Sequence, residues 1–109
     1  MKKKTTWATT AEVLDVYDGD TFRARLDLGW KISLVTMVRV RGINAPELNE
    51  EGGAAARDYL AEMLPVGSVV HIESKRLDKY GRSEASVTLP TRGNLADRLI
   101  AAGFVKKVG

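Results

Sequence analysis

The chain has no cysteine, so neither a disulfide framework nor a thiolate metal site is possible. It has a single histidine, His71, which leaves oxygen as the main ligand type for any bound metal. Aromatic residues make up only 6% of the chain, and no apolar run approaches the length of a membrane span. The basic N-terminus also lacks the apolar stretch of a secretory signal. We therefore expect a soluble, cytoplasmic protein with no membrane partner.

The length of 109 residues fits one small domain. We expect residues 1–10 to form a flexible basic tail and residues 11–109 to form the domain. Lysine and arginine outnumber the acids by 17 to 14, and the resulting charge of +3 suits a polyanionic partner without requiring one. The way these charges are distributed along the chain therefore matters more than their total.

Hydrophobic periodicity predicts the order strand, strand, strand, helix, strand, strand, helix. Alternation marks strands near residues 13–17, 21–28 and 32–40, and the third places Ile32, Leu34, Val38 and Val40 on one face. A helical stripe follows at Ala56, Leu60, Met63 and Leu64. Two more strands lead to a short helix, with Asn94 as its N-cap and Gly103 at its end. This order predicts a mainly β fold with helices, a five-stranded OB-type Greek-key barrel.

Four polar clusters fall in the predicted turns or at strand ends. They are Asp18 with Asp20; Arg39 with Arg41; Asn44 and Pro46 with Glu47; and Lys79, Tyr80 and Arg82. Each has a plain structural explanation, such as a turn former, a solvated strand face, a stiff loop or a hairpin tip. A barrel that brought all four clusters to one rim would instead gather acids and arginines, as a phosphate-processing site requires.

Three motifs resemble the signatures of the staphylococcal nuclease (thermonuclease) family: "VYDGDTF", "VRVRGINAPE" and "DKYGR". They occur in this order and at compatible spacing, and the similarity runs from about Ala11 to Val105. The resemblance implies an OB-type barrel, a Ca²⁺ cofactor, and cleavage of DNA and RNA phosphodiesters that leaves 3′-phosphates.

The resemblance also implies roles for individual residues. Asp20, the side chain of Asn44 and the backbone carbonyl of Ala45 would be Ca²⁺ ligands, with Asp18 as a further carboxylate near the metal. Glu47 would be the general base, and Arg39 and Arg82 would bind the scissile phosphate. Lys79 and Tyr80 would steady a terminal phosphate of the substrate.

The sequence departs from the family pattern in two places. Asn44 stands where the family usually has Asp, so the site has one negative charge fewer and we expect weak Ca²⁺ binding. Only "FVKKVG" follows Gly103, where the family commonly has a further helix. This is the pattern of a short member, which we expect to be a monomer or a weak homodimer.

Two other functions are compatible with the same residues. An OB-type barrel can bind single-stranded nucleic acid without cleaving it, since fold alone does not establish activity. Such a module needs the arginines but has no use for Asp20 and Glu47, which repel phosphate unless a cation intervenes. A metal-regulated interaction domain is the third reading. The retention of both acids favours the nuclease.

Overall fold

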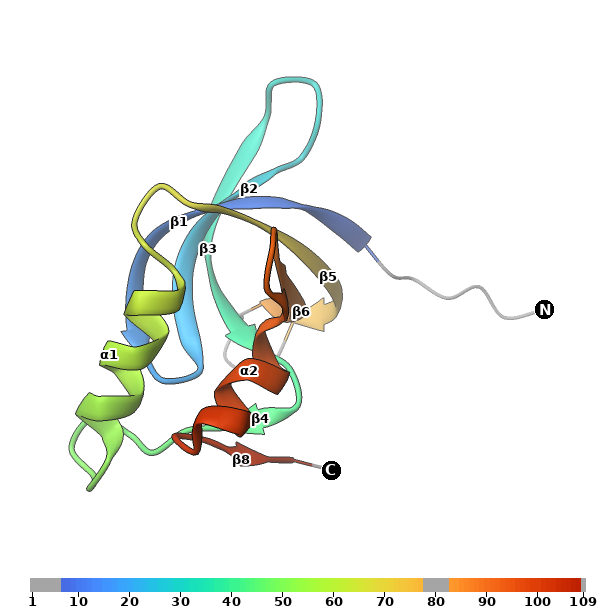
Figure 1. The fold of residues 1–109 in the computed structure, drawn as a ribbon. Helices are drawn as coiled ribbons and strands as arrows, with labels where there is room; N and C mark the ends of the chain where they lie inside the picture. The colour runs from blue at the N-terminus through green and yellow to red at the C-terminus, as the bar shows by residue number, and fades with distance from the viewer. Residues whose placement is uncertain (1–6, 78–82, 109) are drawn as a thin grey trace.

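The computed structural model describes residues 7–77 and 83–108. Its five long strands are β1 (Trp7–Asp18), β2 (Thr21–Asp27), β3 (Ser33–Val40), β5 (Val69–Leu77) and β6 (Ser83–Leu89). Three short strands complete the sheets, namely β4 (Ile43–Asn44), β7 (Gly93–Asn94) and β8 (Lys106–Lys107). The helices are α1 (Gly53–Met63) and α2 (Leu95–Ala102), and both lie toward the lower end of the strands in Figure 1.

The long strands close into a barrel. They are hydrogen-bonded in the order β3-β2-β1-β5-β6, with antiparallel neighbours, and the short β7 continues from β6. A parallel pairing of β3 with β6, from Val38 opposite Ser83 to Val40 opposite Ala85, closes the ring. A separate two-stranded sheet pairs β4 with β8. The predicted five-stranded OB-type barrel with two helices is confirmed.

The core follows from the periodicities of the elements. On β2, Phe22, Ala24 and Leu26 are fully buried, while Arg23 and Arg25 between them are exposed. Helix α1 covers one end of the barrel with the apolar stripe that includes Leu60, and α2 contributes Leu95 and Leu99. Burial of these apolar faces supplies most of the driving force for folding.

The predicted ends of α2 are confirmed. The Asn94 side chain accepts a hydrogen bond from the Asp97 backbone N–H at 3.0 Å, which satisfies one of the open donors of the first turn. Gly103 ends the helix in the left-handed conformation, at φ 86°, which glycine adopts without steric cost.

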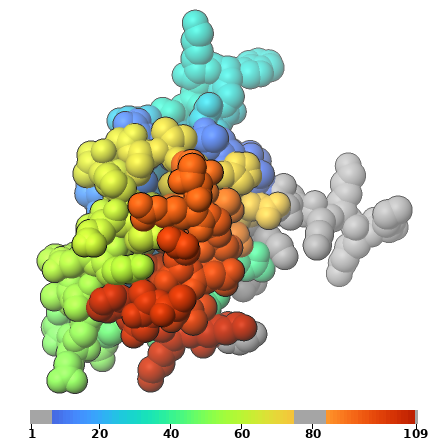
Figure 2. All heavy atoms as spheres, viewed as in Figure 1, coloured from blue at the N-terminus to red at the C-terminus, as the bar shows by residue number. Residues whose placement is uncertain are grey.

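Strand β1 begins earlier in the chain than predicted. Strand β1 begins at Trp7, paired with Ser74 of β5, so residues 7–10 belong to the sheet and not to a tail. Leu34 and Val38 lie on the same face of β3, as predicted, but burial is confined to the end of that face near Val38, since Ile32 and Leu34 are 57% and 48% exposed. The β2–β3 hairpin extends beyond the barrel, as Figures 1 and 2 show, so its outer part has nothing to pack against. Within the described residues, neither helix combines the length and apolarity needed to cross a membrane.

Candidate active site

The turn between β1 and β2 carries Asp18, Gly19 and Asp20 at one end of the barrel. The Asp18 Oδ1 atom accepts a hydrogen bond from the Asp20 backbone N–H at 3.1 Å, which closes the turn. Gly19 is buried, and a Cβ there would lie 2.7 Å from the Cβ of Ala56 and 2.8 Å from that of Ala45. Glycine is therefore needed because the turn packs closely against helix α1 and against the loop after β4. Its φ is not positive, so the turn geometry does not require glycine.

Asp20 is held rigidly by the loop after β4. Its side chain is buried, with the residue only 6% exposed. Oδ1 accepts from the Thr21 hydroxyl at 2.9 Å, and Oδ2 accepts from the Ala45 backbone N–H at 3.0 Å. These two bonds fix the carboxylate next to the loop that also carries Asn44.

The guanidinium group of Arg39 lies close to both the Asp20 carboxylate and the Asn44 side chain. Its Nη2 atom donates to the Ile43 carbonyl at 3.2 Å and to Asn44 Oδ1 at 3.4 Å, and it lies 3.6 Å from Asp20 Oδ2. The strand register explains this convergence, because Arg39 is paired with Thr21, next to the turn. Three of the residues predicted for the site, Asp20, Arg39 and Asn44, thus lie together.

Asp18 is the titratable group most affected by this environment. Its half-buried position, the side-chain hydrogen bond with Asp20 and the charge of Asp20 raise the pKa of the Asp18 carboxyl from its ordinary value of 3.8 to about 6. Burial is the largest of these causes. The protonated form of the Asp18 carboxyl is therefore favoured in the folded protein, chiefly because the group is partly removed from water.

Glu47 lies on the Asp18 side of the loop. The two residues line the same hollow of about 280 Å³, together with Tyr17, Leu48 and Asn49. The Glu47 backbone is held at two points: its N–H donates to Glu50 Oε1 at 2.7 Å, and its carbonyl oxygen accepts from the Glu50 backbone N–H at 2.9 Å. The exposed carboxyl group of Glu47 is thus carried by a fixed backbone, beside the turn that holds Asp18.

Lys79, Tyr80 and Arg82 lie outside the described residues. Strand β6 begins at Ser83, the residue after Arg82, and Ser83 is paired with Val38. The chain therefore enters β6 beside the strand that carries Arg39.

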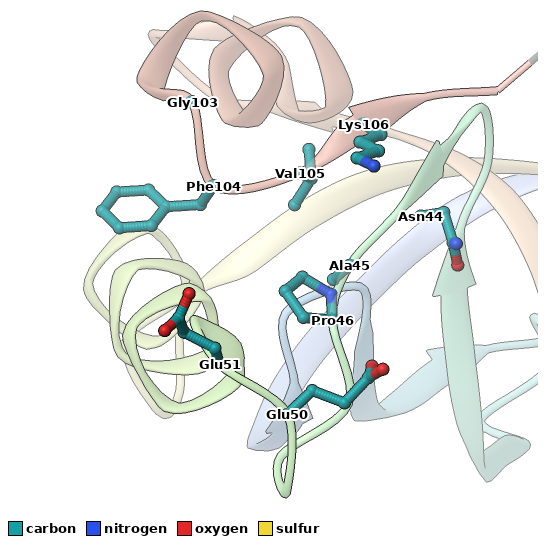
Figure 3. A pocket seen from close by; sticks show the side chains of 9 residues that line it. All are labelled: Asn44, Ala45, Pro46, Glu50, Glu51, Gly103, Phe104, Val105 and Lys106. Atoms are coloured by element: carbon teal, nitrogen blue, oxygen red, sulfur yellow. The ribbon is translucent and has the colours of Figure 1, made fainter.

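A second, larger hollow of about 520 Å³ adjoins Asn44 and Ala45 on the other side of the loop (Figure 3). One of its lining residues, Lys106, is missing from the site predicted from the sequence, although its strand β8 pairs it directly with Asn44. A two-residue strand has no periodicity to reveal it. The only signal was the pair of lysines at 106 and 107, which has no distinctive spacing.

The residues at the turn are chemically suited to Ca²⁺. In the described part of the chain, no three acidic, histidine or cysteine side chains come together as a metal cluster. The donors at this end of the barrel are instead the carboxylates of Asp18 and Asp20, the Asn44 amide and the backbone of Ala45. All are hard oxygen ligands of the kind Ca²⁺ takes. Arg39 lies beside Asp20 and compensates part of the charge of that carboxylate.

A closed five-stranded barrel with acids and an arginine gathered at one end defines an OB-type domain suited to phosphate chemistry. A family model described as staphylococcal nuclease homologue matches residues 37–108, which is most of the chain, and the chain belongs to this family. A comparison with curated proteins finds no match. The matched region contains Arg39, Asn44 and Glu47, and the turn with Asp18 and Asp20, which precedes it in the sequence, contacts it in the fold.

Proposed function

We propose that the protein is a calcium-dependent phosphodiesterase that hydrolyses DNA, RNA or both with little sequence preference. The observation that carries this proposal is that a single nitrogen of Arg39, Nη2, lies close to both Asn44 Oδ1 and Asp20 Oδ2. On a surface that only binds, an acid placed against the phosphate-binding arginine weakens the attraction for phosphate. A hydrolytic site needs both, because it must hold a cation and an anion side by side.

Arg39 binds the scissile phosphate in this proposal. In-line attack by water places additional negative charge on the phosphoryl oxygens, and a fixed guanidinium stabilises that charge where it develops. Arginine suits the role because its planar fork can hold two oxygens and stays charged. By resemblance, Arg82 supplies a second guanidinium, while Lys79 and Tyr80 steady a terminal phosphate.

Asp20, Asn44 Oδ1 and the Ala45 carbonyl would hold the cation, with Asp18 close by. When bound, Ca²⁺ supplies a further positive charge that stabilises the transition state. The amide at Asn44 coordinates with less charge than a carboxylate, so binding is weak and activity requires raised Ca²⁺.

Glu47 acts as general base in this proposal. Its carboxylate takes a proton from the attacking water, the new phosphorus–oxygen bond forms, and the bond to the 5′ oxygen breaks, after which that oxygen takes up a proton from solvent. The products are a 3′-phosphate and a 5′-hydroxyl. Contacts made to phosphate and not to base edges explain the low sequence preference.

One observation favours a second candidate, a non-catalytic module that binds single strands. Both oxygens of Asp20 accept hydrogen bonds from the protein, so this acid also stabilises the loop and would be useful without a metal. The two candidates differ at Glu47, because the nuclease needs its carboxylate as a base and the binding module does not. The Glu47 side chain is exposed and makes no hydrogen bond or ion pair among the described contacts.

The deciding experiment is digestion of single-stranded DNA and RNA with Ca²⁺ or with a chelator. We expect cleavage only with Ca²⁺, and a loss of about 10² to 10⁴ in rate for Glu47→Gln. Glu73→Gln, which removes an exposed carboxylate on β5, is the matched control and should cleave like the parent protein. Binding without cleavage would select the module, and cleavage that survives the chelator would exclude the metal-dependent mechanism.

A further inference from the structure

The hollow of about 520 Å³ shown in Figure 3 lies between the loop after β4 and the segment that follows α2. Its volume is within the range of small-ligand sites. It opens beside Asn44 and Ala45, two of the residues proposed to hold the cation, and none of the roles described above uses it. We refer to it as the C-terminal cleft; its lining includes Pro46, Glu50, Phe104 and Lys106.

One end of the C-terminal cleft is positively charged. Lys106 is paired with Asn44 across the β4–β8 sheet, and the Val108 N–H donates to the Gly42 carbonyl at 2.9 Å, which holds β8 in place. Lys106 is exposed and makes no ion pair within the described part of the chain. Figure 3 shows Lys106 and Asn44 at the same end. A phosphate bound by Lys106 would lie next to the scissile phosphate that we propose Arg39 binds.

The other end is apolar and acidic. Phe104 is half-buried, and its ring stacks on that of Tyr59 with centroids 4.9 Å apart, which fixes one wall. In Figure 3, Phe104 and Glu51 lie at the end away from Asn44, with Pro46 between. Carboxylates repel phosphate but accept hydrogen bonds from the amino groups of bases. This separation of charge favours one orientation of a bound nucleotide.

We propose that the C-terminal cleft binds one nucleotide of a single strand, adjacent to the scissile phosphate. Lys106 contacts the phosphate of that nucleotide, and its base lies toward Pro46 and Phe104 with its amino edge facing the acids. This subsite rests on the proposed nuclease function, since it places the strand across the same Asn44. It adds a phosphate contact that neither the sequence motifs nor the arginines provide.

The test measures binding of labelled oligo(dC) to a Glu47→Gln background without Ca²⁺, so that no cleavage occurs. Lys106→Ala should weaken binding by about 3- to 10-fold and reduce the slope of log affinity against log salt by about 0.7, the value for one phosphate of a single strand. The matched control is Lys107→Ala, which removes the same charge one residue further along β8, outside the cleft lining. It should change both quantities much less, and equal melting temperatures would show that both variants fold.

Base orientation gives a second measurement. Oligo(dC) should bind a few-fold more tightly than oligo(dT), because thymine lacks the amino group, and Glu51→Gln should reduce that preference. Equal losses for Lys106→Ala and Lys107→Ala in a protein that cleaves would overturn the subsite and leave the nuclease intact. A protein that neither binds nor cleaves single strands would overturn both proposals.

Discussion

Asp18→Asn should stabilise the metal-free protein at neutral pH. The pKa of Asp18 is raised in the folded state to about 6, whereas the unfolded chain has the ordinary value of 3.8. A raised folded pKa means that the protonated form is favoured in the fold. The stabilising contribution is therefore complete below about pH 4 and is lost as the pH rises through 6. Asparagine mimics the protonated acid, because it keeps an oxygen to accept the Asp20 N–H and adds a donor beside Asp20.

The size of the effect follows from the shift. A change from 3.8 to about 6 corresponds to an upper limit of about 3 kcal/mol in the free energy of unfolding above pH 7. Asp18 is only half-buried, so solvent screening reduces this to about 1 to 2 kcal/mol. For a domain of this length, that corresponds to a rise in melting temperature of roughly 4 to 10 °C.

Thermal unfolding followed by circular dichroism between pH 4 and pH 8, with a chelator present, measures this directly. The gain of Asp18→Asn should grow from near zero at pH 4 to its full value at pH 7.5. Asp58→Asn, at an exposed acid on α1, should stay within about 0.5 kcal/mol at every pH. A gain of the same size at all pH values, or a loss at pH 7.5, would refute the assigned environment of Asp18.

Three further perturbations test other parts of the site. Asn44→Asp should tighten Ca²⁺ binding by about tenfold, measured by calorimetric titration. This is the low end of the Coulomb range, because Arg39 lies 3.4 Å from the same oxygen and would also pair with the new charge. Equal or weaker binding would contradict the ligand assignment. Arg39→Lys should keep the fold but lower the cleavage rate by about 10²-fold, because the lysine ammonium cannot reproduce the planar fork of the guanidinium group. An unchanged rate would show that Arg39 does not contact the reacting phosphate. Gly19→Ala should lower the free energy of unfolding, measured in urea, by about 1 to 3 kcal/mol, since the new Cβ would lie under 3 Å from Ala45 and Ala56. An unchanged free energy of unfolding would mean that the turn can move away from helix α1.

Much of the fold could be predicted because its signals are local. The alternation on β2 and the cap at Asn94 each depend on a few neighbouring residues, and both agree with the structure. The exposed Ile32 and Leu34 show the limit of such patterns. Alternation reports that a strand has an apolar face, but the point at which the barrel stops covering that face depends on the other strands.

The candidate site was less predictable, because its contacts join distant parts of the chain. The motifs indicated Asp20 and Asn44, but only the fold shows that Oδ2 of Asp20 accepts from the backbone of Ala45, 25 residues away. Lys106 reaches the site through a two-residue strand, which no periodicity could identify. The tight packing at Gly19 was not predictable either, because Ala45 and Ala56, which leave no room for a Cβ there, come from distant parts of the chain.

The close packing at Gly19 has a consequence for the chain during synthesis. Residues 19, 45 and 56 come from three separate segments, and they meet with almost no space between them. Residues 19 and 45 are synthesised before residue 56, so the close packing of the turn is complete only once helix α1 has been made and has docked. The hydrogen bond from the Ala45 backbone to Asp20 can form earlier, because it needs only the turn and the loop after β4.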